Sequence, residues 1–131
     1  MCKNSFIKWE PISELPDEIF IEGLHNDYEG FRILLKGSDD QARMLRITYD
    51  PVLAYRGVDE GDLISYKRFD EDSNLGRWGF FIVKSSDYLE WFLHLSQGIH
   101  ENESIVHYAI YTPNDCLDIL SAYPPEVEWL N

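Results

Sequence analysis

Residues 79–112 read GFFIVKSSDYLEWFLHLSQGIHENESIVHYAIYT, and this stretch decides the fold that the sequence predicts. Residues 80–83 are continuously apolar, a pattern typical of a strand buried on both faces. Ser85, Ser86 and Asp87 then offer oxygen acceptors for the unpaired N–H groups of a helix start, and Glu90 with Asp87 approximates a capping box. A strand followed directly by a helix is therefore predicted.

The predicted helix has one broad apolar face, formed at helical spacing by Tyr88, Trp91, Phe92 and Leu95. Gly98 can adopt the left-handed conformation that closes a helix. Residues 105–112 are apolar or aromatic at most positions and predict a second buried strand. A strand, a helix and a strand at this spacing indicate a crossover unit.

The chain before this unit reads as β-structure. Residues 19–25 and 31–35 predict the two strands of a hairpin, because the turn-forming residues 26–30 lie between them. Residues 44–50 predict a third strand with alternating inward and outward side chains. Residues 63–69 predict another strand, between polar loops at 57–62 and 70–76.

A second helix is predicted to begin at Thr112, which offers a capping hydroxyl before Pro113 and, in the first turn, Asp115. Its apolar stripe would be Cys116, Ile119, Leu120 and Tyr123, and two prolines end it. The fold class that follows is α+β: a mainly antiparallel five- or six-stranded sheet with two helices packed on one face. The 131 residues are expected to form a single globular domain, 1–131.

The net charge of −13 is unevenly distributed. All 11 Lys and Arg residues lie at or before Lys84, whereas residues 85–131 contain eight acids and neither Lys nor Arg. An acidic surface repels nucleic acid and anionic membranes and attracts basic partners. The alternative is that the acidity serves only to keep the protein in solution. The N-terminal stretch has no apolar segment of signal-peptide length, so a cytoplasmic protein is expected.

Catalytic and metal-binding patterns are weak. Asp70, Asp72 and Asn74 have the first spacings of a calcium loop, but Leu75 and Phe81 stand where that loop needs glycine and glutamate. The histidines lack the paired spacing of a zinc site. We therefore expect no metal, no cofactor and no catalytic residue.

Cys116 allows two interpretations. In the first turn of a helix its thiol pKa would be lowered, and His94, His100 or His107 could serve as a base. Because Cys116 also begins a clean apolar stripe, we favour a core cysteine over a nucleophile.

The candidate partner-binding surface combines acids with aromatic residues, because acids steer a basic protein and Tyr and Trp anchor it. The first part of this surface is two acidic loops with two aromatic anchors: Asp59, Glu60, Asp62, Asp70, Glu71 and Asp72, with Tyr66 and Trp78. The second part, after the central helix, is Glu101 and Glu103.

Residues 53–62, LAYRGVDEGD, and residues 127–130, VEWL, occur in a short, strongly acidic chain. In this the chain resembles the immunity proteins of bacterial contact-dependent inhibition and polymorphic toxin systems. The resemblance implies tight, stoichiometric binding that blocks the active site of a co-encoded toxin, often a basic nuclease. Nucleic acid and membrane are not expected as partners. Two alternatives remain open: a small cytosolic enzyme using Cys116 or a histidine, and an interaction or regulatory module with a partner that is not a toxin.

Overall fold

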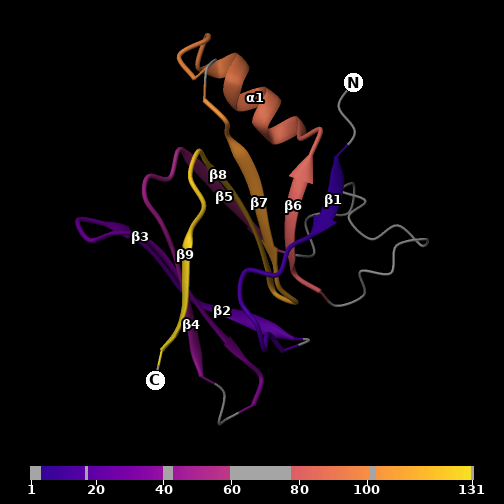
Figure 1. Ribbon diagram of the computed structural model, residues 1–131, viewed down its shortest axis with the longest axis vertical. Coiled ribbons are helices and arrows are strands. Elements are labelled where there is room, and N and C mark those ends of the chain that lie inside the picture. The colour runs from indigo at the N-terminus through magenta and orange to yellow at the C-terminus, as the bar shows by residue number, and fades with distance from the viewer. Residues whose placement is uncertain (1–3, 17, 40–42, 60–77, 101–102, 131) are drawn as a thin grey trace.

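The computed structural model describes residues 4–16, 18–39, 43–59, 78–100 and 103–130. These residues form two antiparallel sheets and one short helix (Figure 1). The five-stranded sheet has the order β1 (Ser5–Lys8), β6 (Phe80–Lys84), β7 (Val106–Tyr111), β8 (Asp115–Ser121) and β5 (Ala54–Asp59). The four-stranded sheet has the order β2 (Ile19–Asp27), β3 (Gly30–Gly37), β4 (Met44–Tyr49) and β9 (Glu126–Leu130).

The main core lies between the two sheets. Alternate side chains of β3 and β4, such as Ile33, Leu35 and Ile47, are fully buried there. They pack against the inner face of the five-stranded sheet, represented by Phe80 and Ile110. Two antiparallel sheets that each bury one apolar face against the other form a β-sandwich.

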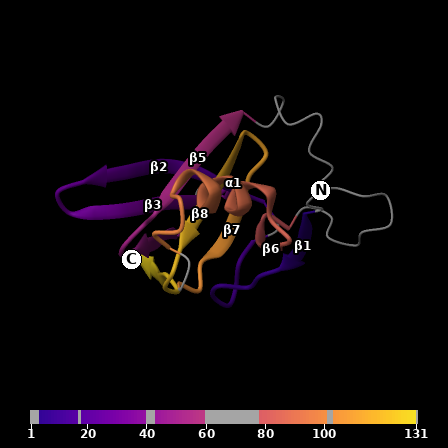
Figure 2. The same cartoon turned by 90° about the horizontal axis from the view of Figure 1, so that it is seen from above.

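The helix α1 (Asp87–Leu95) connects β6 to β7 and covers part of the outer face of the five-stranded sheet (Figures 1 and 2). Ser86 is its N-cap, and the Ser86 Oγ atom accepts the Leu89 N–H at 2.9 Å. Tyr88 and Phe92 pack against Leu120 of β8. This helix covers part of the second face of the sheet, and β7 and β8 are buried on both sides.

The predicted α+β class is wrong. The sequence predicted a single sheet with two helices. The described residues instead form a sandwich of two sheets with one short helix. The predicted crossover is also wrong, because β6 and β7 are antiparallel neighbours and α1 is the connection between them. Residues 127–130 belong to β9, which pairs with β4, with Met44 opposite Leu130.

The predicted second helix is strand β8. Thr112 and Asp115 close the turn between β7 and β8: the Thr112 N–H donates to the Asp115 carbonyl at 2.7 Å, and the Asp115 N–H donates to Thr112 Oγ1 at 3.0 Å. The capping hydroxyl expected to start a helix therefore stabilises a hairpin. Residues 116–121 are buried without interruption, which is a property of a central strand covered on both faces.

Several strands are confirmed. The hairpin of residues 19–25 and 31–35 is β2–β3, the strand of residues 44–50 is β4, and the apolar run 80–83 lies within β6. Residues 57–59, predicted as loop, end β5, while the predicted strand 63–69 lies outside the described residues. No helix in the described part of the chain is long and apolar enough to cross a membrane.

Candidate functional site

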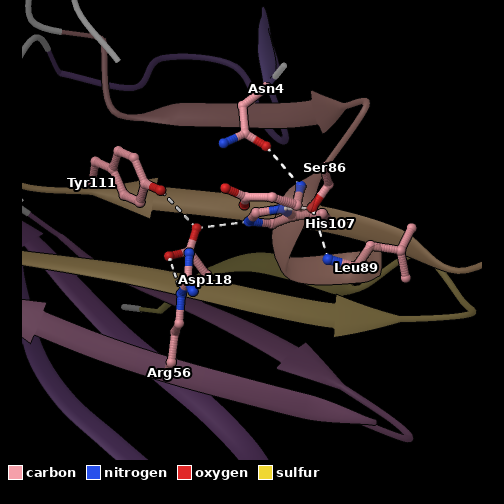
Figure 3. A network of polar contacts seen from close by, with 8 residues as sticks. Asn4, Arg56, Ser86, Leu89, His107, Tyr111 and Asp118 are labelled. Atoms are coloured by element: carbon pink, nitrogen blue, oxygen red, sulfur yellow. Dashed lines mark hydrogen bonds and ion pairs between the residues drawn. The ribbon is translucent and has the colours of Figure 1, made fainter. Parts of the chain in front are cut away.

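The outer face of the five-stranded sheet carries a buried polar network beneath the start of α1 (Figure 3). The network consists of Arg56, Ser86, His107, Tyr111 and Asp118, and we call it the His107 network. Its centre is His107 of β7, which lies 2.6 Å from Ser86 Oγ through Nδ1 and 2.6 Å from Asp118 Oδ1 through Nε2. The side chains of His107 and Asp118 are almost completely buried.

Strand register explains why these residues meet. Ala109 of β7 lies opposite Asp118 of β8, and His107 lies opposite Leu120. His107 and Asp118 are therefore diagonal neighbours on one face of the sheet, within reach of a long side chain. Arg56 lies opposite Asp118 on the other side, in the edge strand β5.

Asp118 accepts three hydrogen bonds through its two oxygens. His107 and the Tyr111 hydroxyl bind Oδ1, the latter at 2.7 Å, and Arg56 Nε binds Oδ2 at 3.0 Å. Burial acts to raise the pKa of Asp118, but the hydrogen bonds from His107 and Tyr111 and the charges of His107 and Arg56 outweigh it. The pKa of Asp118 consequently lies below its ordinary value.

An ionised Asp118 can only accept, so the His107 Nε2 atom must carry the proton of that hydrogen bond. The Nδ1 atom lies 2.6 Å from Ser86 Oγ and accepts the hydrogen bond of that hydroxyl when the ring is neutral. Ser86 Oγ in turn accepts the Leu89 N–H. Each polar group in this series of hydrogen bonds has a partner, from the carboxylate on β8 to the first turn of α1.

Serine, histidine and aspartate in hydrogen-bond contact are also the residue types of a nucleophilic triad. Here the Ser86 residue is only 6% exposed and His107 only 1%. The Ser86 hydroxyl serves as the N-cap of α1, accepting the Leu89 N–H, and is not open to a substrate. The geometry is suited to holding α1 and Arg56 in place.

Above this network lies a shallow groove of about 380 Å³, lined by Tyr55, Arg56, Tyr88 and Trp91. We call it the aromatic groove. The Arg56 guanidinium carbon lies 4.2 Å from the centre of the Tyr88 ring, and the Tyr88 and Trp91 rings stack at 5.8 Å with an angle of 14° between their planes. Trp91 is 55% exposed and Tyr55 is 40% exposed. Arg56 belongs to both the groove and the His107 network.

The aromatic groove departs from what the helical pattern predicts. Tyr88 and Phe92 of the predicted apolar face are buried, but Trp91 and Leu95 are exposed. The buried stripe of α1 is therefore narrower than predicted, and half of the apolar face is left on the surface. Trp91, predicted to pack within the apolar face of the helix, lies at the surface beside Arg56.

Two predicted binding residues have described side chains. Trp78 is half-buried: its Nε1–H donates to the Trp9 carbonyl at 2.9 Å, and the Lys8 ammonium lies 4.4 Å from the centre of its ring. Glu103 is exposed, and its Oε2 atom lies 2.6 Å from His100 Nδ1. These contacts attach Trp78 to the N-terminal segment and Glu103 to the turn after α1.

The structure describes no side chain for the remaining predicted binding residues. Asp59 is the last residue of β5, where its backbone pairs with Asp115. Seven others lie outside the described residues: Glu60, Asp62, Tyr66, Asp70, Glu71, Asp72 and Glu101. The predicted surface therefore stays a prediction, and the site among the described residues is a different one, which sequence analysis missed.

Cys116 lies in β8, where it is 1% exposed within a cluster that includes Phe81, Val83 and Ala109. The helix start that would have lowered its thiol pKa does not exist, so the basis for the nucleophile interpretation is removed. His94 is exposed on α1, whereas His107 is the buried hydrogen-bonded histidine. Among the described residues, no group of His, Cys, Asp and Glu is arranged to hold a metal ion.

No protein family, no curated protein and no solved structure matches this chain. The function therefore has to be inferred from the residues of the chain itself.

Proposed function

We propose that this protein is a cytoplasmic immunity-type binding protein, which neutralises a co-encoded basic toxin by tight stoichiometric binding that blocks the toxin's active site. The observation that carries the proposal is the aromatic groove, Tyr55, Arg56, Tyr88 and Trp91. Tyrosine, tryptophan and arginine are the residues that dominate binding energy in protein interfaces.

The structure of the groove supports a role in binding. Arg56 is fixed by its ion pair with Asp118 and by its position over Tyr88, so little side-chain entropy is lost when a partner contacts it. Trp91 is stacked on Tyr88 and still offers more than half of its surface. A rigid, partly exposed aromatic surface of this kind is pre-organised for a protein partner.

Charge selects the class of partner. Asp87 and Glu90 are exposed on the helix that carries Trp91, and residues 85–131 contain eight acids without a lysine or arginine. The faces of tyrosine and tryptophan also attract lysine and arginine side chains. A basic protein fits both features, and the acidic surface would raise its association rate at low salt.

The test is capture of partners from the native cells at low salt with the full chain as bait, alongside two variants. Trp91→Ala removes the exposed ring of the groove. Leu95→Ala is the matched control, since Leu95 is 61% exposed on the same helix but does not line the groove. We expect one basic protein that binds 1:1 when purified, is toxic when expressed alone and is neutralised by this chain.

For that purified protein, Trp91→Ala is expected to raise the Kd by about 30-fold and Leu95→Ala by less than about 3-fold. A basic protein that is bound but not toxic would replace the toxin with another partner and favour a regulatory module. Failure to retain any stoichiometric basic protein would refute the proposal.

A further inference from the structure

The tip of the β2–β3 hairpin projects away from the body of the sandwich, as both views of the molecule show (Figures 1 and 2). Its turn is formed by Tyr28 and Glu29, between the paired residues Asp27 and Gly30. Tyr28 is 97% exposed, the highest value among the exposed large hydrophobic residues of the described chain. Neither a hydrogen bond nor a ring contact is found for Tyr28 within the described residues. This side chain therefore contributes nothing visible to the fold.

The backbone that presents Tyr28 is nevertheless fixed. Asp27 Oδ1 accepts the Glu29 N–H at 2.9 Å and Arg32 Nη1 at 2.8 Å, and the same Nη1 donates to the Gly30 carbonyl at 3.0 Å. Gly30 has a φ of 109°, a conformation that side-chain-bearing residues rarely adopt. These hydrogen bonds fix the backbone of the turn before and after Tyr28 and Glu29. The hydrogen bond from Arg32, with that from the Glu29 N–H, lowers the pKa of Asp27 to about 2. Asp27 consequently stays ionised and bonded to Arg32 even in acid that protonates an ordinary aspartate.

The hairpin is anchored next to the aromatic groove directly behind its tip. Phe31, which follows Gly30, is 2% exposed, and its ring centre lies 4.8 Å from that of Tyr55. Tyr55 lines the groove. A partner that fills the groove therefore contacts Tyr55. The Tyr55 ring in turn contacts Phe31, the first residue after the tip. The hydrogen bonds of the turn and the buried Phe31 behind it make the hairpin tip a rigid projection.

The chemistry of the projection indicates what it enters. Tyrosine gives a large contact area with few rotatable bonds, and its hydroxyl can hydrogen-bond at the bottom of a recess. Residues 22–32 contain three acids (Glu22, Asp27 and Glu29) and one arginine, Arg32. Asp27 is already paired with Arg32, so Glu22 and Glu29 leave the segment with a net charge of −2 (three acids and one arginine). A projecting tyrosine beside Glu29 complements a concave surface lined with lysine or arginine.

We infer that the hairpin tip, residues 27–30 with Tyr28 at its apex, inserts into a basic recess of the protein partner as a second contact beside the aromatic groove. This inference rests on the proposed function and deepens it by naming the surface that enters the partner's cleft. A catalytic cleft that binds polyanionic nucleic acid has this basic, concave character.

The experiment replaces Tyr28 in the full chain. Tyr28→Ala is expected to raise the Kd for the basic protein retained by the wild-type chain at least 10-fold, an effect of about 1.4 kcal/mol or more. Tyr123→Ala is the matched control, because Tyr123 is 61% exposed on a different loop, and it should change the Kd by less than about 3-fold. The midpoint of urea unfolding should be the same for the wild-type chain and Tyr28→Ala, so that loss of binding is not loss of folding.

A direct readout uses the photoreactive residue p-benzoylphenylalanine, placed at position 28 in one protein and at position 123 in another. Position 28 is expected to cross-link to a peptide of the basic protein that contains Lys or Arg, and position 123 is not. If the basic protein is retained but Tyr28→Ala binds it as tightly as the wild type, the hairpin inference is overturned while the proposed function stands. If no basic protein is retained, both are overturned.

Discussion

The Nε2 atom of His107 lies 2.6 Å from the Oδ1 atom of Asp118, and both side chains are almost fully buried. Two strands of one sheet are thus joined by a buried hydrogen bond to a carboxylate in a place where apolar side chains usually pack. Removing one member of such a buried pair leaves the other buried without a hydrogen-bond partner. Mutation of either residue is therefore strongly destabilising, even when the net contribution of the pair to stability is small.

Asp118→Ala is expected to lower the free energy of unfolding by about 3 kcal/mol, because His107, Tyr111 and Arg56 all lose their acceptor. Urea unfolding followed by circular dichroism measures the change. Asp115→Ala is the control, since Asp115 begins the same strand with an exposed side chain and should change stability by less than about 0.5 kcal/mol. Equal stability of the two variants would show that the His107 network does not hold the fold.

The stabilisation from Asp118 is expected to depend on pH. Its folded pKa is lowered beneath the unfolded value of about 3.9, so the stability from the ionised carboxylate is fully present above that pH. It is lost as the pH falls through the folded pKa. Asp118→Asn cannot ionise, so the gap in unfolding free energy between the wild type and this variant should be constant above about pH 5 and shrink below about pH 4. Urea titrations at a series of pH values measure the gap, and a gap that widens on acidification would contradict the lowered pKa.

Gly79 and Gly57 form a matched pair of glycines at sheet positions. A Cβ atom at Gly79 would overlap the Tyr111 carbonyl oxygen, whereas a Cβ at Gly57 would meet Leu117 Cδ1 at an ordinary 3.8 Å. Gly79→Ala should therefore force β6 and β7 apart and cost about 3 kcal/mol of stability. Gly57→Ala should change stability by less than about 0.5 kcal/mol. Thermal unfolding compares them, and a harmless Gly79→Ala would mean that the two strands are further apart than described.

Cys116 is expected to resist thiol reagents in the folded protein, because it is 1% exposed on a central strand. In a Cys2→Ser background, maleimide should label Cys116 only as fast as the protein opens, and quickly once urea unfolds it. Mass spectrometry follows the labelling. Rapid, complete labelling of the native protein would place the thiol at the surface and return it to consideration as a nucleophile.

The local elements of the fold were largely predictable. The apolar run 80–83, the capping residues before α1 and the turn chemistry of residues 26–30 each indicate their structure through contacts within a few residues. The turn at Thr112 shows where this approach fails. The same residues, a hydroxyl, a proline and an acid, can begin a helix or close a hairpin. Only the burial of residues 116–121 on both faces distinguishes the strand from the helix.

The candidate site was less predictable, because it is built by register between strands far apart in the sequence. Arg56 and Asp118 are 62 residues apart and meet only when β5 pairs with β8. The exposure of Trp91 could not be read from helical spacing, which gives the direction of a side chain but not the width of the sheet beneath it.

The strand order has a consequence for how quickly the chain folds. The pairings β2–β3, β3–β4, β6–β7 and β7–β8 join strands that are adjacent in the sequence, whereas β1–β6, β5–β8 and β4–β9 join distant ones. Distant pairings require large loops to close before any contact is gained, and chains dominated by them fold on the order of milliseconds to seconds. The hairpins can form early as separate units, while β1, β5 and β9, which join through distant pairings, add late. Until then the sheet edges that these strands cover stay open to pairing with other chains, which makes the interval before closure the time of greatest exposure to aggregation.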